Sequence, residues 1–332
     1  MSKVVLHIGG HKTATTTIQD MFHGNADTLA EHGVIYPRFD RQTGHHGLVI
    51  NWAKMPKMFR LPDGDIGTLT ALAERYGPGD QTLFLSSEEF SRDRCLVDIA
   101  KIREVLAPFD EIEVICVLRS QWQFLQSAYV EVSRGRCPPR PGKVVEQAIE
   151  TSLYEGLWVD YNRLVERLEG VFAPEEITLF SFEECRNHPG GIVGRFLEHL
   201  GLDIDQSQLE TVNEGNSNVS PMSLASYAAN ILAEPTPAPL WLIDKAAHGL
   251  RQEFGGVVKP CLFTRAEFAT LKSHFDPLNA ELALRPAAQR NGFSISPLEP
   301  RGVNLFREDI SAAYWARMAK MGFEKMLRSR KS

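Results

Sequence analysis

The chain has 332 residues, of which 43% are hydrophobic and 23% are charged, and its formal net charge is −6 at pH 7. These values are ordinary for a globular protein, and the negative charge argues against a surface devoted to nucleic acid. No apolar run approaches the ~18 residues that an integral membrane segment requires, and the 5 cysteines lack the spacing of a disulfide framework or a zinc site.

The chain opens with an apolar strand and a turn that leads into a helix. Residues 4–8 suit a buried parallel strand, and Gly9 and Gly10 let the backbone turn sharply and approach a ligand closely. From Thr15 onward, apolar residues recur at helical spacing until Gly33 offers a stop. The strand begins too early to leave room for a signal peptide, so we expect a cytoplasmic protein.

The turn between this strand and the helix has the composition of an anion cradle. The helix start offers free N–H groups and the positive end of the helix dipole. The ammonium of Lys12 and the hydroxyls of Thr13, Thr15 and Thr16 come at the same point of the chain. Threonines at a helix start also cap helices that bind no ligand. A nucleotide-hydrolysing P-loop has its lysine directly before the metal-binding hydroxyl and after the last glycine. Lys12 comes too early for that pattern.

A long polar loop follows the first helix and a short extended segment at residues 34–37. Residues 40–48 are polar and contain two glycines, and patterning stays poor as far as residue 65. Loops of this length inside a compact domain tend to be functional or mobile. His45 and His46 are therefore candidates for acceptor binding or for proton transfer, although exposed loop histidines are more often simply solvated.

The segment 81–90 predicts a second strand with a polar, acidic end. A kinase would normally carry a metal-holding Asp after such a strand, whereas this chain has Ser86, Ser87, Glu88 and Glu89. The carboxyl ends of strands are where open α/β sheets bind ligands, which makes Glu88 a candidate general base. The alternative is that Ser87 caps the next turn and the glutamates complement its dipole.

A third strand, residues 111–119, follows a predicted helix at 95–107. Its continuous apolar run from Val114 to Leu118 suggests the centre of the sheet, and it ends on Arg119. Ser120 and Gln123 match a capping box for a helix that continues to Gly135. The proline-rich, basic segment 136–143 is expected to be a loop.

Two of these motifs resemble the PAPS-dependent sulfotransferases, which use 3′-phosphoadenosine 5′-phosphosulfate (PAPS) as donor. Residues 12–16, Lys-Thr-Ala-Thr-Thr, resemble the 5′-phosphosulfate loop of that family, whose pattern is Lys-Ser/Thr-Gly-Thr-Thr. Ala14 replaces the usual glycine and is strained if it must adopt a positive φ. The family binds the 3′-phosphate with a strand-end arginine and a serine eight residues later, and Arg119 and Ser127 have that separation. The resemblance thus implies cofactor contacts from Gly10, His11, Lys12, Thr13, Ala14, Thr15, Thr16, Arg119 and Ser127.

The rest of the sequence predicts further core elements and then, from about residue 203, helices without strand-like runs. A helix at 158–169, a strand at 177–180 and a helix between Pro189 and Gly201 complete a core over residues 1–202, which we expect to bind PAPS. Residues 203–332 are expected to form a helical cap of the same catalytic unit. Arg285, Arg301 and Gly302 lie in polar loops from which a group can reach the 3′-phosphate. A final helix at 308–327 can dock on the body or on a second subunit, which leaves an oligomer open.

The resemblance implies a three-layer P-loop-type α/β fold with a parallel sheet of about five strands. The implied reaction transfers a sulfuryl group from PAPS to the hydroxyl or amine of a small-molecule or carbohydrate acceptor, without a metal. Lys12 is expected to stabilise the leaving phosphate oxygen, and Glu88 or His46 to accept the acceptor's proton. A P-loop nucleotide or small-molecule kinase and a non-catalytic nucleotide-binding module remain alternatives.

Overall fold

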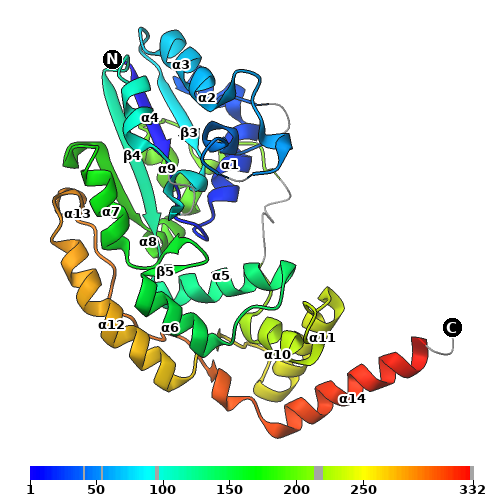
Figure 1. The fold of residues 1–332 in the computed structure, drawn as a ribbon. Helices are drawn as coiled ribbons and strands as arrows, with labels where there is room; N and C mark the ends of the chain where they lie inside the picture. The colour runs from blue at the N-terminus through cyan, green and yellow to red at the C-terminus, as the bar shows by residue number, and fades with distance from the viewer. Residues whose placement is uncertain (40–41, 54, 94–96, 213–219, 330–332) are drawn as a thin grey trace. The chain divides into compact units, whose positions relative to one another are not determined.

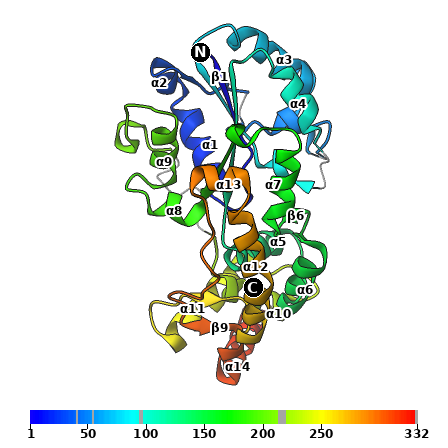
Figure 2. The same cartoon turned by 90° about the vertical axis from the view of Figure 1, so that its left-hand side faces the viewer.

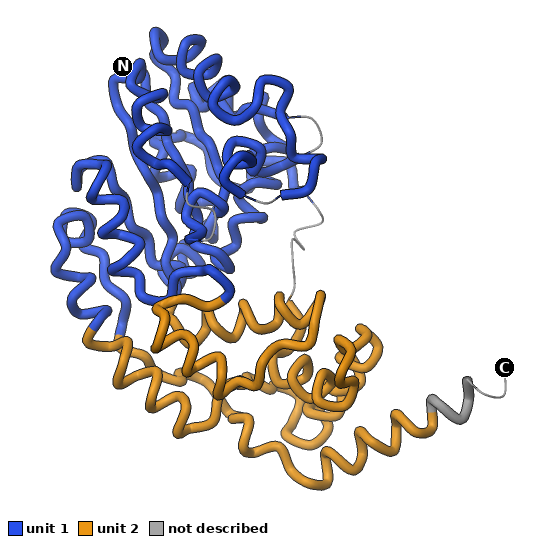
Figure 3. Tube along the Cα trace, viewed as in Figure 1, with its two compact units in different colours: residues 1–119, 155–218, 278–296 blue, residues 120–154, 219–277, 297–332 orange. Residues whose placement is uncertain are grey.

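The computed structural model describes residues 1–39, 42–53, 55–93, 97–212 and 220–329. They form two compact units, coloured separately in Figure 3. Unit 1 comprises residues 1–119, 155–218 and 278–296, and unit 2 comprises residues 120–154, 219–277 and 297–332. Within the described ranges, no helix is both long and apolar enough to cross a membrane.

Unit 1 is built on a five-stranded parallel sheet with the order β2-β3-β1-β4-β7. The strands are β1 (Lys3–His7), β2 (Val34–Ile35), β3 (Thr82–Ser86), β4 (Glu111–Leu118) and β7 (Ile177–Ser181). Val5 of the central strand pairs with Phe84 on one side and with Glu113 on the other. The predicted fold class is therefore confirmed, but the centre of the sheet is β1 and not the strand at 111–119, because β4 has only β7 on its outer side.

The two faces of the sheet are covered by separate sets of helices, which makes three layers (Figure 2). Val4 and Leu6 of β1 pack in one apolar cluster with α3 (Gly64–Tyr76), α4 (Ile99–Val105), α7 (Tyr161–Glu169) and α13 (Pro286–Asn291). Val5 packs in the other with α1 (Thr15–Gly24), α2 (Ala26–Glu31), α8 (Phe182–Asn187) and α9 (Gly191–His199). Alternate residues of a buried parallel strand thus supply two cores.

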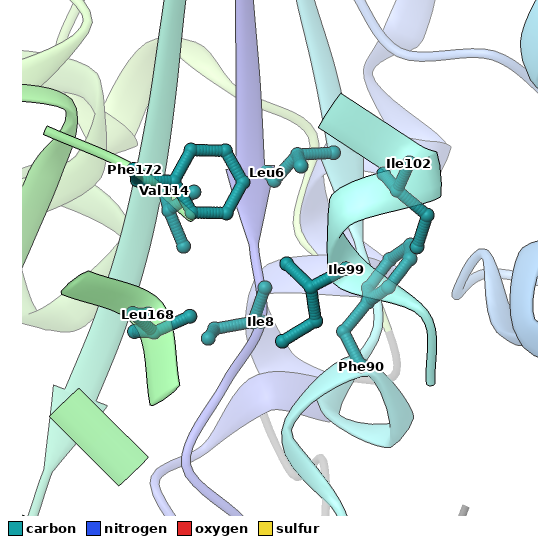
Figure 4. Close-up of a pocket in the computed structure, with 8 residues that line it drawn as sticks. All are labelled: Leu6, Ile8, Phe90, Ile99, Ile102, Val114, Leu168 and Phe172. Carbon is teal, nitrogen blue, oxygen red and sulfur yellow. The ribbon is translucent and has the colours of Figure 1, made fainter. Parts of the chain in front are cut away.

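A small apolar cavity lies beside β1 on the α4 and α7 face (Figure 4). Leu6 and Ile8 line it together with Phe90, Ile99 and Phe172 and three further apolar residues, and its volume is about 10 Å³. A space of that size without polar partners does not hold an ordered water. It is a packing gap in the core.

Three local predictions are wrong. The first helix does not run on to Gly33, because the Asn25 side chain donates to Met21 O, the carbonyl of the preceding turn, and α1 ends at Gly24. Ser120 precedes α5 without a side-chain capping bond. The segment 136–143 is helical from Pro141 onward, since proline is tolerated in the first turn of a helix. Helix α3 was not predicted, because Gly64 and Gly67 obscure its apolar spacing.

Unit 2 is mainly helical, and Figure 1 shows its helices in chain order by colour. It contains α5 (Gln121–Gly135), α6 (Pro141–Thr151), α10 (Ser223–Ala233), α11 (Leu240–Phe254) and α14 (Ala312–Ser329), and residues 265–277 of α12 (Arg265–Ala283). The two-residue strands β8 (Pro260–Cys261) and β9 (Leu305–Phe306) pair in parallel. Tyr314 of α14 is fully buried, and its hydroxyl donates to Ala246 O of α11 at 3.1 Å.

The chain passes between the units several times, and the short strands β5 (Leu153–Tyr154) and β6 (Leu157–Trp158) come before and after one of these points in the sequence. The expected helical character after residue 203 is present. The expected division into a cofactor-binding core and a cap at 202/203 does not coincide with a passage between the units, and as a division of function it stays a prediction.

Candidate functional site

The turn after β1 is built directly onto the neighbouring strand β4. Gly10 N–H donates to Val117 O at 3.0 Å, and Val117 N–H donates to Gly9 O at 2.9 Å. A Cβ on Gly10 would lie 2.5 Å from Val117 O, and one on Gly9, where φ is +77°, would lie 2.7 Å from Cβ of Glu88. Both positions therefore require glycine, because Gly10 lies against β4 and Gly9 lies against the segment after β3.

The loop from Gly10 to Ala14 has the backbone form of an anion-binding concavity. Lys12 and Ala14 have positive φ angles of 63° and 60° on either side of Thr13. Alternation of this kind turns successive N–H groups toward one point. The first helical bonds of α1 run from the N–H groups of Thr17 and Ile18 to Ala14 O, so the N–H groups of the preceding residues come before the helical ladder.

The threonine hydroxyls of the loop divide into two kinds. Thr13 is buried and its hydroxyl donates to Gly10 O, and the Thr15 hydroxyl also donates to Gly10 O, at 3.4 Å. These two bonds hold the shape of the loop. Thr16 is half-buried, one position further along the helix start. Thr13 can thus contact a ligand through its backbone N–H group, because its hydroxyl already donates to Gly10 O within the turn.

We expect Ala14→Gly to raise the free energy of unfolding by up to ~1 kcal/mol. The left-handed conformation costs an L-residue ~1–2 kcal/mol, and part of that gain is lost to the larger entropy of glycine in the unfolded chain. Ala14→Val should lower stability, because a β-branched residue tolerates positive φ poorly. Denaturant titration measures both, with Ala30→Gly in the right-handed helix α2 as a destabilising control. A loss of stability in Ala14→Gly as large as in Ala30→Gly would contradict the strain at Ala14.

Arg119 follows β4 and is held against the cradle. Its Nη1 donates to Lys12 O at 3.1 Å, and its guanidinium lies over the ring of Phe182 at 4.8 Å from the centroid. The Tyr161 hydroxyl donates to Arg119 O at 2.7 Å. Burial, the largest effect, lowers the pKa of Arg119, and Glu183 opposes that effect. The guanidinium remains a cation at neutral pH.

Glu88 lies at the same edge of the sheet, in the short 3₁₀ helix η3 (Glu88–Ser91) that follows β3. Gln19 of α1 donates to Glu88 Oε2 at 3.1 Å. Burial raises the pKa of Glu88, but the nearby rings of His46 and His11 and the hydrogen bonds to the carboxylate outweigh it, and the net pKa is lowered. The side chain is thus a carboxylate at neutral pH. Ser87 also caps η3 by accepting from Glu89 N–H at 3.3 Å, as the alternative interpretation expected.

The structure distinguishes the two adjacent loop histidines. His45 is 1% exposed; its Nδ1 accepts from Ser86 N–H at 2.9 Å, its Nε2 lies 2.8 Å from Pro37 O, and burial lowers its pKa to about 3. It is a neutral structural residue that fastens the loop to β3. His46 begins the 3₁₀ helix η1 (His46–Val49), is half-buried, and its Nδ1 lies 2.8 Å from Ser87 Oγ. His46 and Glu88 are therefore neighbours.

His11 completes the cradle from the side of Glu88. Its Nε2 is buried and has no hydrogen-bond partner among the described residues. Burial lowers the pKa of His11 to about 4, against the attraction of Glu88, and Arg92 and Lys12 lower it further. A neutral imidazole with an unsatisfied buried nitrogen is a group from which a ligand can gain a hydrogen bond.

The other predicted residues are placed as follows. Ser127 is half-buried on α5 in unit 2, whereas Arg119 belongs to unit 1, so their pairing stays a prediction. Arg285 donates to Glu169 at 2.6 Å and to Asn162 at 3.2 Å. Arg301 pairs with Glu299 in unit 2, beside Gly302. The Arg285 contacts explain its position without a ligand.

Sequence reasoning missed two residues of the site, Gln19 and Phe182. Gln19 interrupts the apolar face of α1, which was the available signal for it. Phe182 directly follows β7, between Ser181 and Glu183, and nothing in the sequence marked it as a site residue. In the part of the chain that the structure describes, no group of three or more His, Cys, Asp or Glu side chains is arranged to hold a metal ion.

Comparison with known proteins gives the following. No protein-family model and no curated protein matches the chain. Among solved structures, a sulfotransferase from Alicyclobacillus acidocaldarius is similar with 15% identity and a TM-score of 0.41, over 74% of this chain and 95% of that one. The sulfotransferase domain of the Synechococcus PCC 7002 olefin synthase is similar with 12% identity and a TM-score of 0.35, over 82% of this chain and 94% of that one. Both are described as sulfotransferases.

Proposed function

We propose that this protein is a PAPS-dependent sulfotransferase that transfers a sulfuryl group to the hydroxyl, or the amine, of a small-molecule or carbohydrate acceptor. The observation that carries the proposal is the hydrogen bond from Arg119 Nη1 to Lys12 O at 3.1 Å. It joins the two motifs, more than a hundred residues apart in the sequence, into one cationic site. A nucleotide with phosphates at both its 3′ and 5′ positions is a ligand that needs two such groups side by side.

The residues of the cradle fit the phosphosulfate end of PAPS. The alternating backbone of Lys12 and Ala14 and the start of α1 provide N–H groups for the 5′-phosphate. The Thr15 and Thr16 hydroxyls lie at the same helix start, and the unsatisfied His11 Nε2 is a further polar atom at this point. PAPS, when bound, supplies an activated sulfuryl group on a phosphate leaving group. Gly10, Thr13 and Ala14 shape the loop.

Arg119 is the proposed ligand of the 3′-phosphate. A guanidinium grips phosphate oxygens with two parallel hydrogen bonds, which a lysine cannot do. The Phe182 ring beneath the guanidinium keeps it in one orientation. The residue is therefore preorganised before a ligand arrives.

The proposed chemistry is an in-line displacement at sulfur. A bond forms between the acceptor oxygen and sulfur, the bond from sulfur to the 5′-phosphate oxygen breaks, and that oxygen leaves with the electron pair as part of adenosine 3′,5′-bisphosphate. The proton of the acceptor hydroxyl goes to the Glu88 carboxylate, with His46 as the alternative acceptor. Lys12 balances the charge that develops on the leaving oxygen.

Ligand selectivity tests the proposal. Adenosine 3′,5′-bisphosphate should bind at least tenfold tighter than AMP, because one charge-assisted phosphate contact contributes ~1.5–3 kcal/mol. Adenosine 2′,5′-bisphosphate is the matched control, since it has the same charge with the second phosphate displaced. Calorimetric titration and thermal shift measure all three, and a ligand at a hundred times its dissociation constant stabilises the native state by ~2.7 kcal/mol.

The outcomes separate the three candidate functions. Equal affinity for AMP and the 3′,5′-bisphosphate contradicts the sulfotransferase. Tighter binding of ATP with magnesium, accompanied by phosphoryl transfer, indicates the kinase. Tight 3′,5′-bisphosphate binding without turnover of PAPS on hydroxyl, amine and carbohydrate acceptors indicates a non-catalytic module.

A further inference from the structure

Gln19 is a buried amide on the face of α1 that packs against the sheet. It is 2% exposed, although its neighbours on that face, Ile18, Met21 and Phe22, are apolar. Burial of an amide is costly unless hydrogen bonds replace its bonds to water. The position therefore requires partners, and the identity of those partners indicates what the residue does.

The Gln19 Nε2 group lies within reach of three acceptors. The distances are 3.1 Å to Glu88 Oε2, 3.3 Å to Ser86 Oγ and 3.4 Å to Ser86 O. The bond to the Glu88 carboxylate is the shortest and the only one of the three to an ionised group, so it is the strongest. Gln19 is thus attached first to the proposed base.

The hydrogen bonds continue from Gln19 into the core. Ser86 Oγ lies 2.9 Å from Nδ1 of His7, which is fully buried on the central strand β1. The ring of Phe196 packs edge-on against His7 at 4.9 Å between centroids. Gln19, Ser86 and His7 lie on α1, β3 and β1, so the chain of polar groups is fixed to three elements of the core. Side chains held in this way keep a charged group in one orientation.

The other end of the Gln19 amide is covered by the loop that includes Gly44. A Cβ on Gly44 would lie 2.6 Å from Gln19 Oε1 and 2.8 Å from His46 Nε2. Because glycine occupies this position, the loop can lie directly on Gln19 and His46. The same loop thus covers the amide and places the second candidate base.

We propose that Gln19 is a positioning residue, whose amide N–H holds the Glu88 carboxylate in the orientation in which it accepts the acceptor's proton. The inference rests on the proposed function, since it assigns a role in that reaction. An amide that merely fills space in the core would not need to donate to the carboxylate, and a side chain of the same length without a donor, such as methionine, would serve.

Within the described residues, the titratable groups that interact with Glu88 come from four segments. They are His46 of η1, His11 of the cradle, His7 of β1 and Tyr36 after β2. Burial lowers the pKa of His7 to about 4, so it is neutral near pH 7. His46 and His11 favour the ionised form of Glu88, and the hydrogen bond from the Gln19 amide adds to their effect. Its removal should therefore raise the pKa of Glu88.

The test measures the Glu88 carboxyl itself and turnover in parallel. The protein is labelled with ¹³C at the glutamate carboxyl carbon, and the Glu88 signal is assigned by its loss in Glu88→Gln. In Gln19→Met the titration of Glu88 should move to higher pH by about one unit, a tenfold change in proton affinity, and Gln19→Glu should move it further through like-charge repulsion. The acidic limb of the pH profile of kcat/KM should move with it, while the Kd of adenosine 3′,5′-bisphosphate changes less than threefold.

Asn25→Ala is the matched control, because Asn25 is a 4% exposed amide at the end of the same helix whose partners are backbone atoms of Met21 and Glu210. It should lower thermal stability without moving the titration of Glu88. An unshifted titration and limb in both Gln19 variants overturn the positioning role, even if the protein is a sulfotransferase. A shifted titration in a protein that turns over no PAPS overturns the proposed function, and with it the role in proton transfer, while the contact itself is verified.

Discussion

Glu88→Gln should lower turnover of PAPS by ~10²–10⁴, the contribution typical of a general base. The substitution keeps the size of the side chain and removes its ability to accept a proton. Affinity for adenosine 3′,5′-bisphosphate should stay nearly unchanged, because the cradle and Arg119 are intact. Single-turnover kinetics with an acceptor in excess, together with calorimetric titration of the bisphosphate, measures the two effects separately.

His46→Asn is the companion variant, since His46 is the other candidate base and adjoins Glu88 through Ser87. It should have a smaller effect than Glu88→Gln, because the lowered pKa of Glu88 already makes that side chain the ionised acceptor at neutral pH. A loss of turnover in His46→Asn but not in Glu88→Gln would mean that His46, and not Glu88, is the base. Full turnover in both variants would mean that neither residue is the base.

Lys12→Ala should lower kcat by ~10²–10³, the scale seen when one donor to a developing oxyanion is removed. Negative charge on the bridging phosphate oxygen builds up only as the bond to sulfur breaks, so the lysine acts more strongly in the transition state than in the ground state. Affinity for the bisphosphate product should fall much less, because the start of α1 and Arg119 remain. Pre-steady-state kinetics measures kcat, and titration measures affinity.

Arg119→Ala should show the reverse pattern, with cofactor affinity weakened ten- to a hundredfold and a smaller effect on the rate of the bound complex. Arg119 also donates to Lys12 O, so Arg119→Lys, which keeps the charge without the planar fork, separates charge from geometry. If Lys12→Ala changes only affinity and Arg119→Ala changes only kcat, the assigned roles are contradicted.

The strands of the sheet, though not their order, could be predicted because each of the longer strands has its own local signal. Continuous apolar runs ending in Gly, Ser-Glu or Arg predicted β1, β3 and β4, and the structure has all three side by side and parallel. The carboxyl ends of parallel strands meet at one edge, so residues that follow different strands become neighbours. That rule alone brings Lys12, Glu88 and Arg119 to one edge of unit 1.

The wrong end of the first helix has a cause that lies partly outside the helix itself. Asn25 ends α1 by bonding to the backbone of Met21 and of Glu210, and the second contact is 185 positions away in the sequence. Periodicity measures only the burial expected along one element, so it cannot detect a contact made by a remote segment. Helix α3 was missed for a local reason, since its two glycines obscure the apolar spacing.

The sequence by itself determined the strands of unit 1, the cradle composition and the order of candidate residues along the chain, because these depend on local spacing, and its resemblance to the sulfotransferases implied the fold class. Only the tertiary structure showed that His45 is a buried structural residue. The backbone and ring of His45 bond to both backbone groups of Ser86, which fixes it in the core and leaves its neighbour beside Ser87. The tertiary structure alone also revealed the hydrogen bond from Gln19 to Glu88, since that contact joins α1 to the segment after β3. Hydrogen bonds between remote segments select one side chain among chemically equal candidates, and a single sequence contains no record of which segments will meet.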